Sequence, residues 1–139
     1  MLRPAQPREG VADIEAVRHG EARAVSCFLR GAVTAYPRRL KQGRLVLAGR
    51  QASWTPFWSI RRQPMVIDLD VSSVESRPAD HREPNVKKGG KAYGVVAIPS
   101  FWVVTCHTDS GSADLVVPAA DAPLVKTFFS ELGRANPDR

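Results

Sequence analysis

Two short basic segments carry the side chains best suited to hold an anion. In the first, Arg38, Arg39 and Lys41 follow one another closely between Pro37 and Gly43. Several cations on one turn can converge on a phosphate, and each guanidinium can donate two hydrogen bonds to it. A solvated turn between two strands would have the same composition. The segment therefore indicates either phosphate binding or an ordinary polar turn.

The second basic segment surrounds two glycines. Lys87, Lys88 and Lys91 flank Gly89 and Gly90, and such a loop can present backbone N–H groups to an anion. It has neither the spacing of a P-loop nor the Ser or Thr that follows the P-loop lysine. The alternative is a flexible linker between strands.

A third segment mixes aromatic rings with cations. Trp58, Arg61 and Arg62 lie in the stretch 56–64, which has a proline at each end and is predicted to be a loop. On a protruding loop these side chains would suit a membrane interface, a protein partner or stacked bases. The alternative is that the aromatic side chains of this region are buried, and Trp54 in particular is expected in the core.

No arrangement typical of catalysis or metal binding stands out. Cys106 and His107 are adjacent, and neighbours in a strand face opposite sides of the sheet, so they cannot form a nucleophile–base pair with each other. The three histidines and two cysteines are scattered and have no metal-ligand spacing. We expect no catalytic residue, no metal and no cofactor. Cys27 and Cys106 are expected to be buried free thiols, and a disulfide between two strands remains open.

Length and charge restrict the class of protein further. The 139 residues suffice for one domain, and the net charge of +6 favours phosphate-bearing partners, whether nucleic acid or anionic lipid, with a merely solvated basic surface as the alternative. No apolar run reaches the roughly 20 residues that span a bilayer, and the polar, proline-rich start lacks the apolar segment of a secretory signal. The expected location is the cytoplasm, with any membrane contact peripheral and at the inner face.

These side chains are expected to be positioned by a series of strands. Apolar or alternating stretches, most of them bounded by Pro, Gly or Asp, predict strands. The predicted strands are Ala24–Tyr36, Arg44–Ala48, Gln51–Thr55, Met65–Val71, Tyr93–Ile98, Phe101–Thr108 and Ala113–Val117. A bend or bulge is expected near Ser72–Ser73, where the alternation changes phase, and residues 77–92 are expected to form a long polar loop.

One amphipathic helix is predicted to end the domain. Asp121 is a suitable N-cap, and Gly133 suits a left-handed stop. Between them Leu124, Phe128 and Leu132 recur at helical spacing and form an apolar stripe. Before the strands, residues 1–10 are predicted to be a flexible arm and residues 11–23 a short helix or linker. The domain proper is expected at 24–133, with a tail at 134–139.

This order of elements resembles the pleckstrin-homology-like superfamily, including its bacterial and GRAM-like forms. The resemblance rests on Arg44–Gly49 running into Ser53–Pro56, on Met65–Val71 followed by Val74, and on the hairpin Phe101–Val117 before the closing helix. A fainter similarity links the chain to small uncharacterised actinobacterial proteins. It rests on the segments Ser26–Arg30, Phe57–Arg61 and Arg82–Pro84.

The resemblance implies a mainly β (α+β) fold of about seven antiparallel strands. They would form a split barrel of two orthogonal sheets, with the helix closing one end. It also implies a non-enzymatic binding role. In lipid-binding members the ligand meets basic residues around the first strand pair. At the matching positions this sequence has Arg30, Arg38, Arg39, Lys41 and Arg44.

Three functional hypotheses follow. The first is a non-catalytic module that recognises a segment of another protein, or that acts in a small assembly with itself or another protein, for which an exposed strand edge would serve. The second is a peripheral binder of anionic phospholipid headgroups through the basic loops. The third is nucleic-acid binding, which ranks below the others because the basic residues are spread over several loops.

Overall fold

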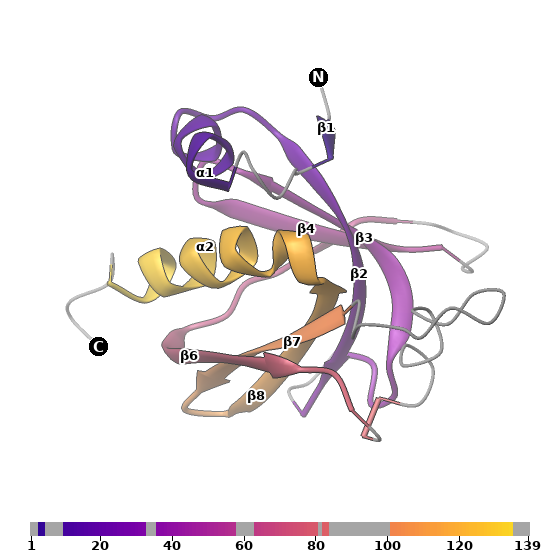
Figure 1. The fold of residues 1–139 in the computed structure, drawn as a ribbon. Helices are drawn as coiled ribbons and strands as arrows, with labels where there is room; N and C mark the ends of the chain where they lie inside the picture. The colour runs from indigo at the N-terminus through magenta and orange to yellow at the C-terminus, as the bar shows by residue number, and fades with distance from the viewer. Residues whose placement is uncertain are drawn as a thin grey trace, which may run out of the picture.

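The computed structural model describes residues 3–4, 10–32, 36–57, 63–80, 82–83 and 101–134. Its main strands are β2 (Arg23–Gly31), β3 (Lys41–Ala48), β4 (Gln51–Pro56), β5 (Met65–Val66), β6 (Val71–Pro78), β7 (Phe101–Thr108) and β8 (Gly111–Pro118). They form one antiparallel sheet in the order β5-β4-β3-β2-β8-β7-β6, and the two-residue β1 (Arg3–Pro4) pairs in parallel with β2. A short 3₁₀ turn, η3 (Ala119–Asp121), leads into the C-terminal helix α2 (Ala122–Arg134) (Figure 1). The prediction of a mainly β chain with a closing helix is confirmed.

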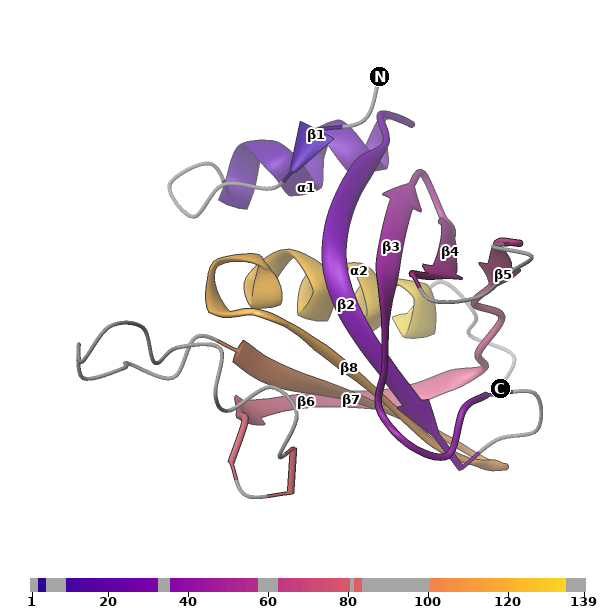
Figure 2. The ribbon, with the colours of Figure 1, turned by 90° about the vertical axis from the view of Figure 1, so that its right-hand side faces the viewer.

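Strand β2 joins the two halves of this sheet. Its residues 23–29 pair with β3, whereas its residues 28–31 pair with β8, so the ladder passes from one neighbour to the other along its length. Figure 2 shows β2 as a long curved strand, with β3 and β4 on one side and β7 and β8 crossing behind it. The curvature wraps the sheet around α2, and the described strands do not close into a barrel.

The core lies between the concave face of the sheet and α2. Along β3, Leu45 and Leu47 are fully buried while Arg44 between the buried positions is exposed, as a strand with one solvated face requires. From α2, Phe128 and Phe129 enter the core and pack edge to face with ring centroids 5.0 Å apart. Burying a side chain of this size stabilises a fold by about 1.5–3 kcal/mol. The predicted apolar stripe of the helix is therefore confirmed as the closing face of a single interior.

The side chain of Trp54 ties β4 to β2 across β3. It is 3% exposed, and its Nε1 donates a hydrogen bond to the carbonyl of Cys27 at 3.0 Å. The indole passes over Gly43, where a Cβ atom would lie 2.5 Å from the ring. Glycine is required at this position by the close approach of the ring. The expectation that Trp54 belongs to the core is confirmed.

The predicted N-terminal helix is present as α1 (Gly10–Arg18). Its buried residues Ile14 and Val17 face α2, and the Val17 carbonyl accepts a 2.8 Å hydrogen bond from the backbone N–H of Gly49 in the β3–β4 turn. Beneath the helix, the buried carboxylate of Asp13 accepts a hydrogen bond from Arg23 Nε at 2.9 Å. The helix is thus fastened to both the sheet and α2. None of the described helices has the length and apolar character needed to cross a bilayer.

The prediction of one strand over Met65–Val71 is wrong. Met65–Val66 pairs with β4 at one edge of the sheet, and Val71 begins β6 at the opposite edge. The burial pattern itself is as expected, because Ile67 and Val71 are buried whereas Asp68 and Asp70 face solvent. The alternation of apolar and polar residues therefore indicates which side chains face the core, although the backbone passes here from one edge of the sheet to the other.

Other boundaries also differ from the predictions. The expected bulge is confirmed as a register shift between Val71 and Ser73, but β6 continues to Pro78, so the polar loop does not begin at residue 77. Strand β2 ends at Gly31 and not at Tyr36. Gly133 lies inside α2 and not at its end, and an added Cβ there would lie 2.9 Å from the Val71 carbonyl oxygen. The predicted strand 93–98 lies outside the described residues.

Candidate functional site

One edge of the sheet carries backbone groups that no described strand covers. Ala79 N–H donates to the Phe101 carbonyl at 3.0 Å, so residues 79 and 101 form a hydrogen-bonded pair. In an antiparallel ladder such pairs alternate, so Arg77 and Glu75 also face β7 with their backbone groups. The N–H and C=O groups of Val74 and Ser76 must then point away from β7. Within the described part of the chain, β6 pairs with β7 alone.

A groove runs beside this edge, between β6 and α2. A hollow of about 600 Å³ lies next to a second one of about 310 Å³, and Ser130 lines both. We call the two together the edge groove. Its lining residues come from three elements and the turn before α2: Val71–Val74, Ser76, Trp102, Ala119, Ala122, Pro123, Lys126, Thr127, Ser130 and Gly133.

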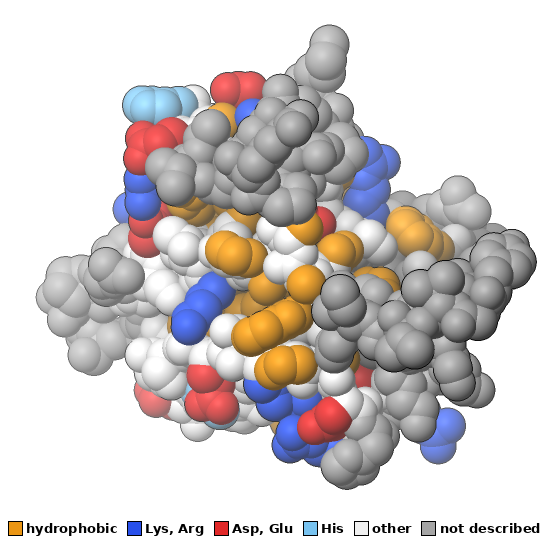
Figure 3. All heavy atoms as spheres, in the orientation of Figure 1, with side chains coloured by type: hydrophobic (Ala, Val, Ile, Leu, Met, Phe, Trp, Pro, Cys, Tyr) orange, Lys and Arg blue, Asp and Glu red, His pale blue; other side chains and the backbone are white. Residues whose placement is uncertain are grey.

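The chemistry of the edge groove is that of a partly apolar surface with hydroxyl groups and one cation. Trp102 is partly buried at its floor, Pro123 is exposed, and Lys126 stands at the solvent side of α2. Figure 3 shows hydrophobic side chains gathered on this face of the molecule, with cationic and acidic side chains around them. An extended segment lying there could pair with the β6 backbone and place alternate side chains against α2.

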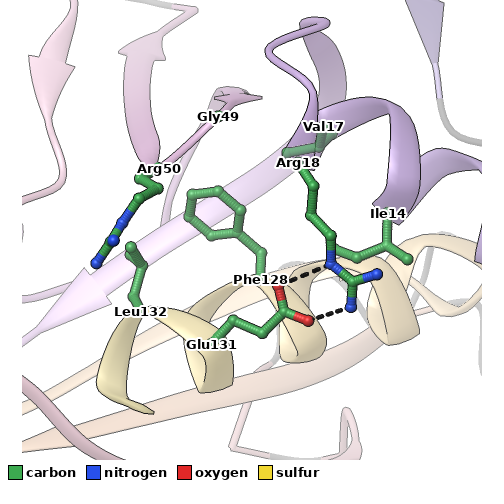
Figure 4. Close-up of a pocket in the computed structure, with 8 residues that line it drawn as sticks. All are labelled: Ile14, Val17, Arg18, Gly49, Arg50, Phe128, Glu131 and Leu132. Carbon is green, nitrogen blue, oxygen red and sulfur yellow. Dashed lines mark hydrogen bonds and ion pairs between the residues drawn. The ribbon is translucent and has the colours of Figure 1, made fainter. Parts of the chain in front are cut away.

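A third hollow, separate from the edge groove, lies on the other flank of α2, against α1. This α1 hollow has a volume of about 270 Å³ and is lined by Ile14, Val17, Arg18, Gly49, Arg50, Phe128, Glu131 and Leu132. Figure 4 shows the Phe128 ring between Arg50 and Arg18, with the Arg18 guanidinium bound to the Glu131 carboxylate. Arg18 also pairs with Glu15 within α1. The hollow thus has an apolar floor and a charged rim.

The predicted anion-binding residues Arg38, Arg39, Lys41 and Arg44 are all exposed. None of these four cations has an ion-pair partner in the described ranges. They do not all share one face, however. In β3, Lys41 lies on the same side as the buried Gly43, whereas Arg44 lies on the opposite side beside Ser26 and Thr55.

Arg30, the fifth basic residue of that set, already holds two anions of this chain. Its guanidinium donates to Asp114 at 2.6 Å and to Glu83 at 3.2 Å. Glu83 is fully buried and also accepts two hydrogen bonds from Arg77, at 2.9 and 2.8 Å. Because of these bonds, chiefly those from Arg77, the pKa of Glu83 is lowered to about 2. Arg30 therefore has a structural role on the outer face of the sheet.

The other predicted contact residues, Lys87, Lys88, Lys91, Trp58, Arg61 and Arg62, lie outside the described residues.

The cysteines are buried free thiols, as predicted. Burial raises the pKa of the Cys106 thiol to about 12, so it is protonated at neutral pH and a poor nucleophile. His107 lies on the opposite face, where its Nε2 is 3.1 Å from a carboxylate oxygen of Glu75. No group of three or more metal-ligating side chains occurs among the residues that the structure describes.

Sequence reasoning missed the edge groove because its residues carry no motif. Ser76, Trp102 and Lys126 are far apart in the chain and are chemically ordinary one by one. The one signal was the polar stretch after Val71, where an edge strand with a solvated face could have been expected. The chain matches no protein-family model and no curated protein.

Proposed function

We propose that this chain is a non-catalytic binding module that recognises an extended segment of another protein. The segment adds as a strand to β6 and lies in the edge groove against α2. The observation that carries this proposal is the coincidence of outward-pointing backbone groups at Val74 and Ser76 with a groove beside them. Main-chain hydrogen bonds would supply affinity, and the groove would select side chains.

The fold supports the same proposal. We propose that the two halves of the sheet correspond to the crossed sheets of a pleckstrin-homology-like domain, with α2 as the closing helix. In Figure 2, β3 and β4 run steeply across β6 and β7, and α2 occupies the space between the halves. Such a scaffold is rigid where the helix packs and open along β6, which suits a recognition surface.

The lining of the edge groove favours a particular segment. Among the described residues that line the groove, Lys126 is the one cation and none is acidic. A segment with an acidic residue near Lys126 and an apolar residue over Trp102 therefore complements it. Rim charges of this kind contribute more to selectivity and association rate than to affinity.

The test uses random peptides of about twelve residues, long enough to cover β6. Peptides selected on the wild-type domain are measured against Ser76→Pro, which removes one outward N–H and leaves the ladder to β7 intact. Loss of that bond and the steric effect of the ring should weaken binding at least about tenfold. Ser76→Ala is the matched control, because it removes the hydroxyl and keeps the backbone N–H. Equal affinity of the wild type and a folded Ser76→Pro variant would refute strand addition.

A second comparison tests the position of the segment. Lys126→Glu should weaken the binding of the selected peptides, most of all of those with acidic residues. Lys41→Glu is the control, because it makes the same charge change at an exposed site away from the groove. If both substitutions weaken binding equally, net charge and not the edge groove determines recognition.

One observation favours a second function, the binding of anionic headgroups. Arg38, Arg39 and Lys41 are exposed around the β2–β3 turn and are not neutralised by any described carboxylate. We expect sedimentation with vesicles containing about 30% phosphatidylserine that weakens as salt rises. Equal sedimentation with neutral phosphatidylcholine vesicles would rule this function out, as would an unchanged result for the Arg38→Gln, Arg39→Gln double variant.

A further inference from the structure

We propose that the α1 hollow is a separate binding site for a small amphiphilic carboxylate. The hydrocarbon part of the ligand packs on Phe128, and its carboxylate pairs with Arg50. This site lies on the opposite flank of α2 from the edge groove, and the two share none of the lining residues that the structure describes.

The floor of the α1 hollow is apolar and fixed. Ile14, Val17 and Phe128 are 8%, 1% and 3% exposed, so their positions are determined by the core and not by solvent. The volume of about 270 Å³ is just below the usual range for ligand pockets, about 300–1,000 Å³. A short hydrocarbon chain suits this space better than a larger ligand.

The charges at the rim select the head group. The Arg18 guanidinium is bound by two acids, Glu131 through Nε and Nη2 and Glu15 through Nη1, so its charge is compensated. Arg50 is exposed at the β3–β4 turn and has no ion-pair partner within the described ranges. Of the three described charged residues that line the hollow, Arg18 and Glu131 neutralise each other and Arg50 leaves one positive charge, since Glu15 is not among the lining residues. This charge complements one anionic group, and a guanidinium matches the two oxygens of a carboxylate.

The walls of the hollow are held in place before any ligand arrives. The N–H of Gly49, next to Arg50, donates to the Val17 carbonyl at 2.8 Å and so fixes the turn against α1. Gly49 has a φ of 61°, which a glycine adopts without strain. The Arg18–Glu131 pair links α1 to α2 on the other side. Little ordering is needed on binding, which favours affinity for a small ligand.

Isothermal titration with octanoate tests the proposal. We expect one saturable site in the millimolar range or tighter, with affinity rising about threefold to fourfold per methylene from hexanoate to octanoate. Octylamine, with the same chain and the opposite charge, should not bind. Arg50→Gln should weaken octanoate at least about tenfold. Arg44→Gln, an equally exposed and unpaired arginine outside the hollow, should leave the affinity unchanged.

Two further variants locate the octanoate site on the molecule. Leu132→Trp fills the hollow and should abolish octanoate binding while the melting temperature shows that the fold persists. Ser76→Pro, which acts on the edge groove, should leave octanoate binding intact. The proposal is overturned by any of three results: no saturable binding of octanoate, equal binding of octanoate and octylamine, or equal losses in Arg50→Gln and Arg44→Gln.

Discussion

Two buried carboxylates in this molecule have opposite surroundings. Glu83, packed on the outer face of the sheet, receives two hydrogen bonds from Arg77, one from Arg30 and one from the backbone N–H of Asp80 at 3.0 Å. Asp121 lies where η3 enters α2 and is 7% exposed. Its Oδ1 has no hydrogen-bond partner among the described residues.

The two environments shift the acidities in opposite directions. The guanidinium groups lower the pKa of Glu83 to about 2, whereas burial, together with the nearby charge of Asp13, raises the pKa of Asp121 to about 6. Glu83 is therefore a stabilising element, which fastens the segment after β6 to β2. Asp121 is a cost to the fold at neutral pH, located where α1, β2 and α2 meet. A buried carboxylate can thus stabilise or destabilise the fold, depending on whether it has hydrogen-bond donors around it.

The largest effect is expected from removing the paired carboxylate. Glu83→Gln leaves the Arg77 guanidinium without its bidentate partner and should lower the free energy of unfolding by about 3 kcal/mol. Arg30 keeps Asp114 as a partner, which limits the loss. Urea unfolding at pH 7 measures the change. A loss below about 0.5 kcal/mol would show that this network is no stronger than a surface ion pair.

The dependence of stability on pH should reflect the ionisation of both carboxylates. The lowered pKa of Glu83 contributes stability that is present above about pH 4.5 and is lost as the pH falls toward 2. The raised pKa of Asp121 has the reverse sign: ionisation destabilises the fold progressively as the pH rises from about 4 to 6. For these two groups alone, the free energy of unfolding is largest near pH 4–5. Unfolding by urea across pH 3–8 tests this, and a profile that rises steadily to pH 8 would contradict it.

Asp121→Asn should stabilise the protein, by a smaller amount. Asparagine keeps the size of the residue while removing the charge. We expect the free energy of unfolding to rise by about 1–2 kcal/mol at pH 7.5. This is less than the full pKa shift implies, because one polar group of the amide would also lack a hydrogen-bond partner. The gain should vanish near pH 4, where Asp121 is protonated. An equal gain at both pH values would assign the effect to packing and not to charge.

Part of the fold followed directly from the sequence. Phe101–Thr108 was predicted to the residue because both of its ends are marked, by Pro99 and Ser100 before it and by Asp109–Gly111 after it. The apolar stripe of α2 was equally plain. Met65–Val71 failed because alternation reports which side chains are buried and not which strand the backbone pairs with. Pairing partners depend on the path of the whole chain.

The candidate sites were harder to predict, for a related reason. Arg30 was predicted to bind the anion of a ligand, and in the structure its guanidinium pairs with Glu83 and Asp114 of the same chain. Burial of Glu83 depends on the fold, so no local pattern could reveal that pairing. Asp121 was predicted as a helix cap from its position, but it belongs to the 3₁₀ turn η3 that leads directly into α2, and its side chain makes no capping hydrogen bond to the described residues. Its raised pKa arises from burial and from Asp13, over one hundred positions away in the sequence.

The smallest effect is expected at the exposed end of the Glu83 region. Arg82 donates two side-chain hydrogen bonds to Asp80, at 3.1 and 2.7 Å, and both side chains are open to solvent. The pKa of Asp80 is lowered, chiefly by the Arg82 hydrogen bonds, yet water can replace that partner. Arg82→Gln should therefore leave the urea midpoint at pH 7 unchanged within error, in direct contrast to Glu83→Gln one position later. A clear loss in Arg82→Gln would mean that the exposed pair holds Asp80 in place for its backbone bond to Glu83, and that the stabilising region extends to the surface.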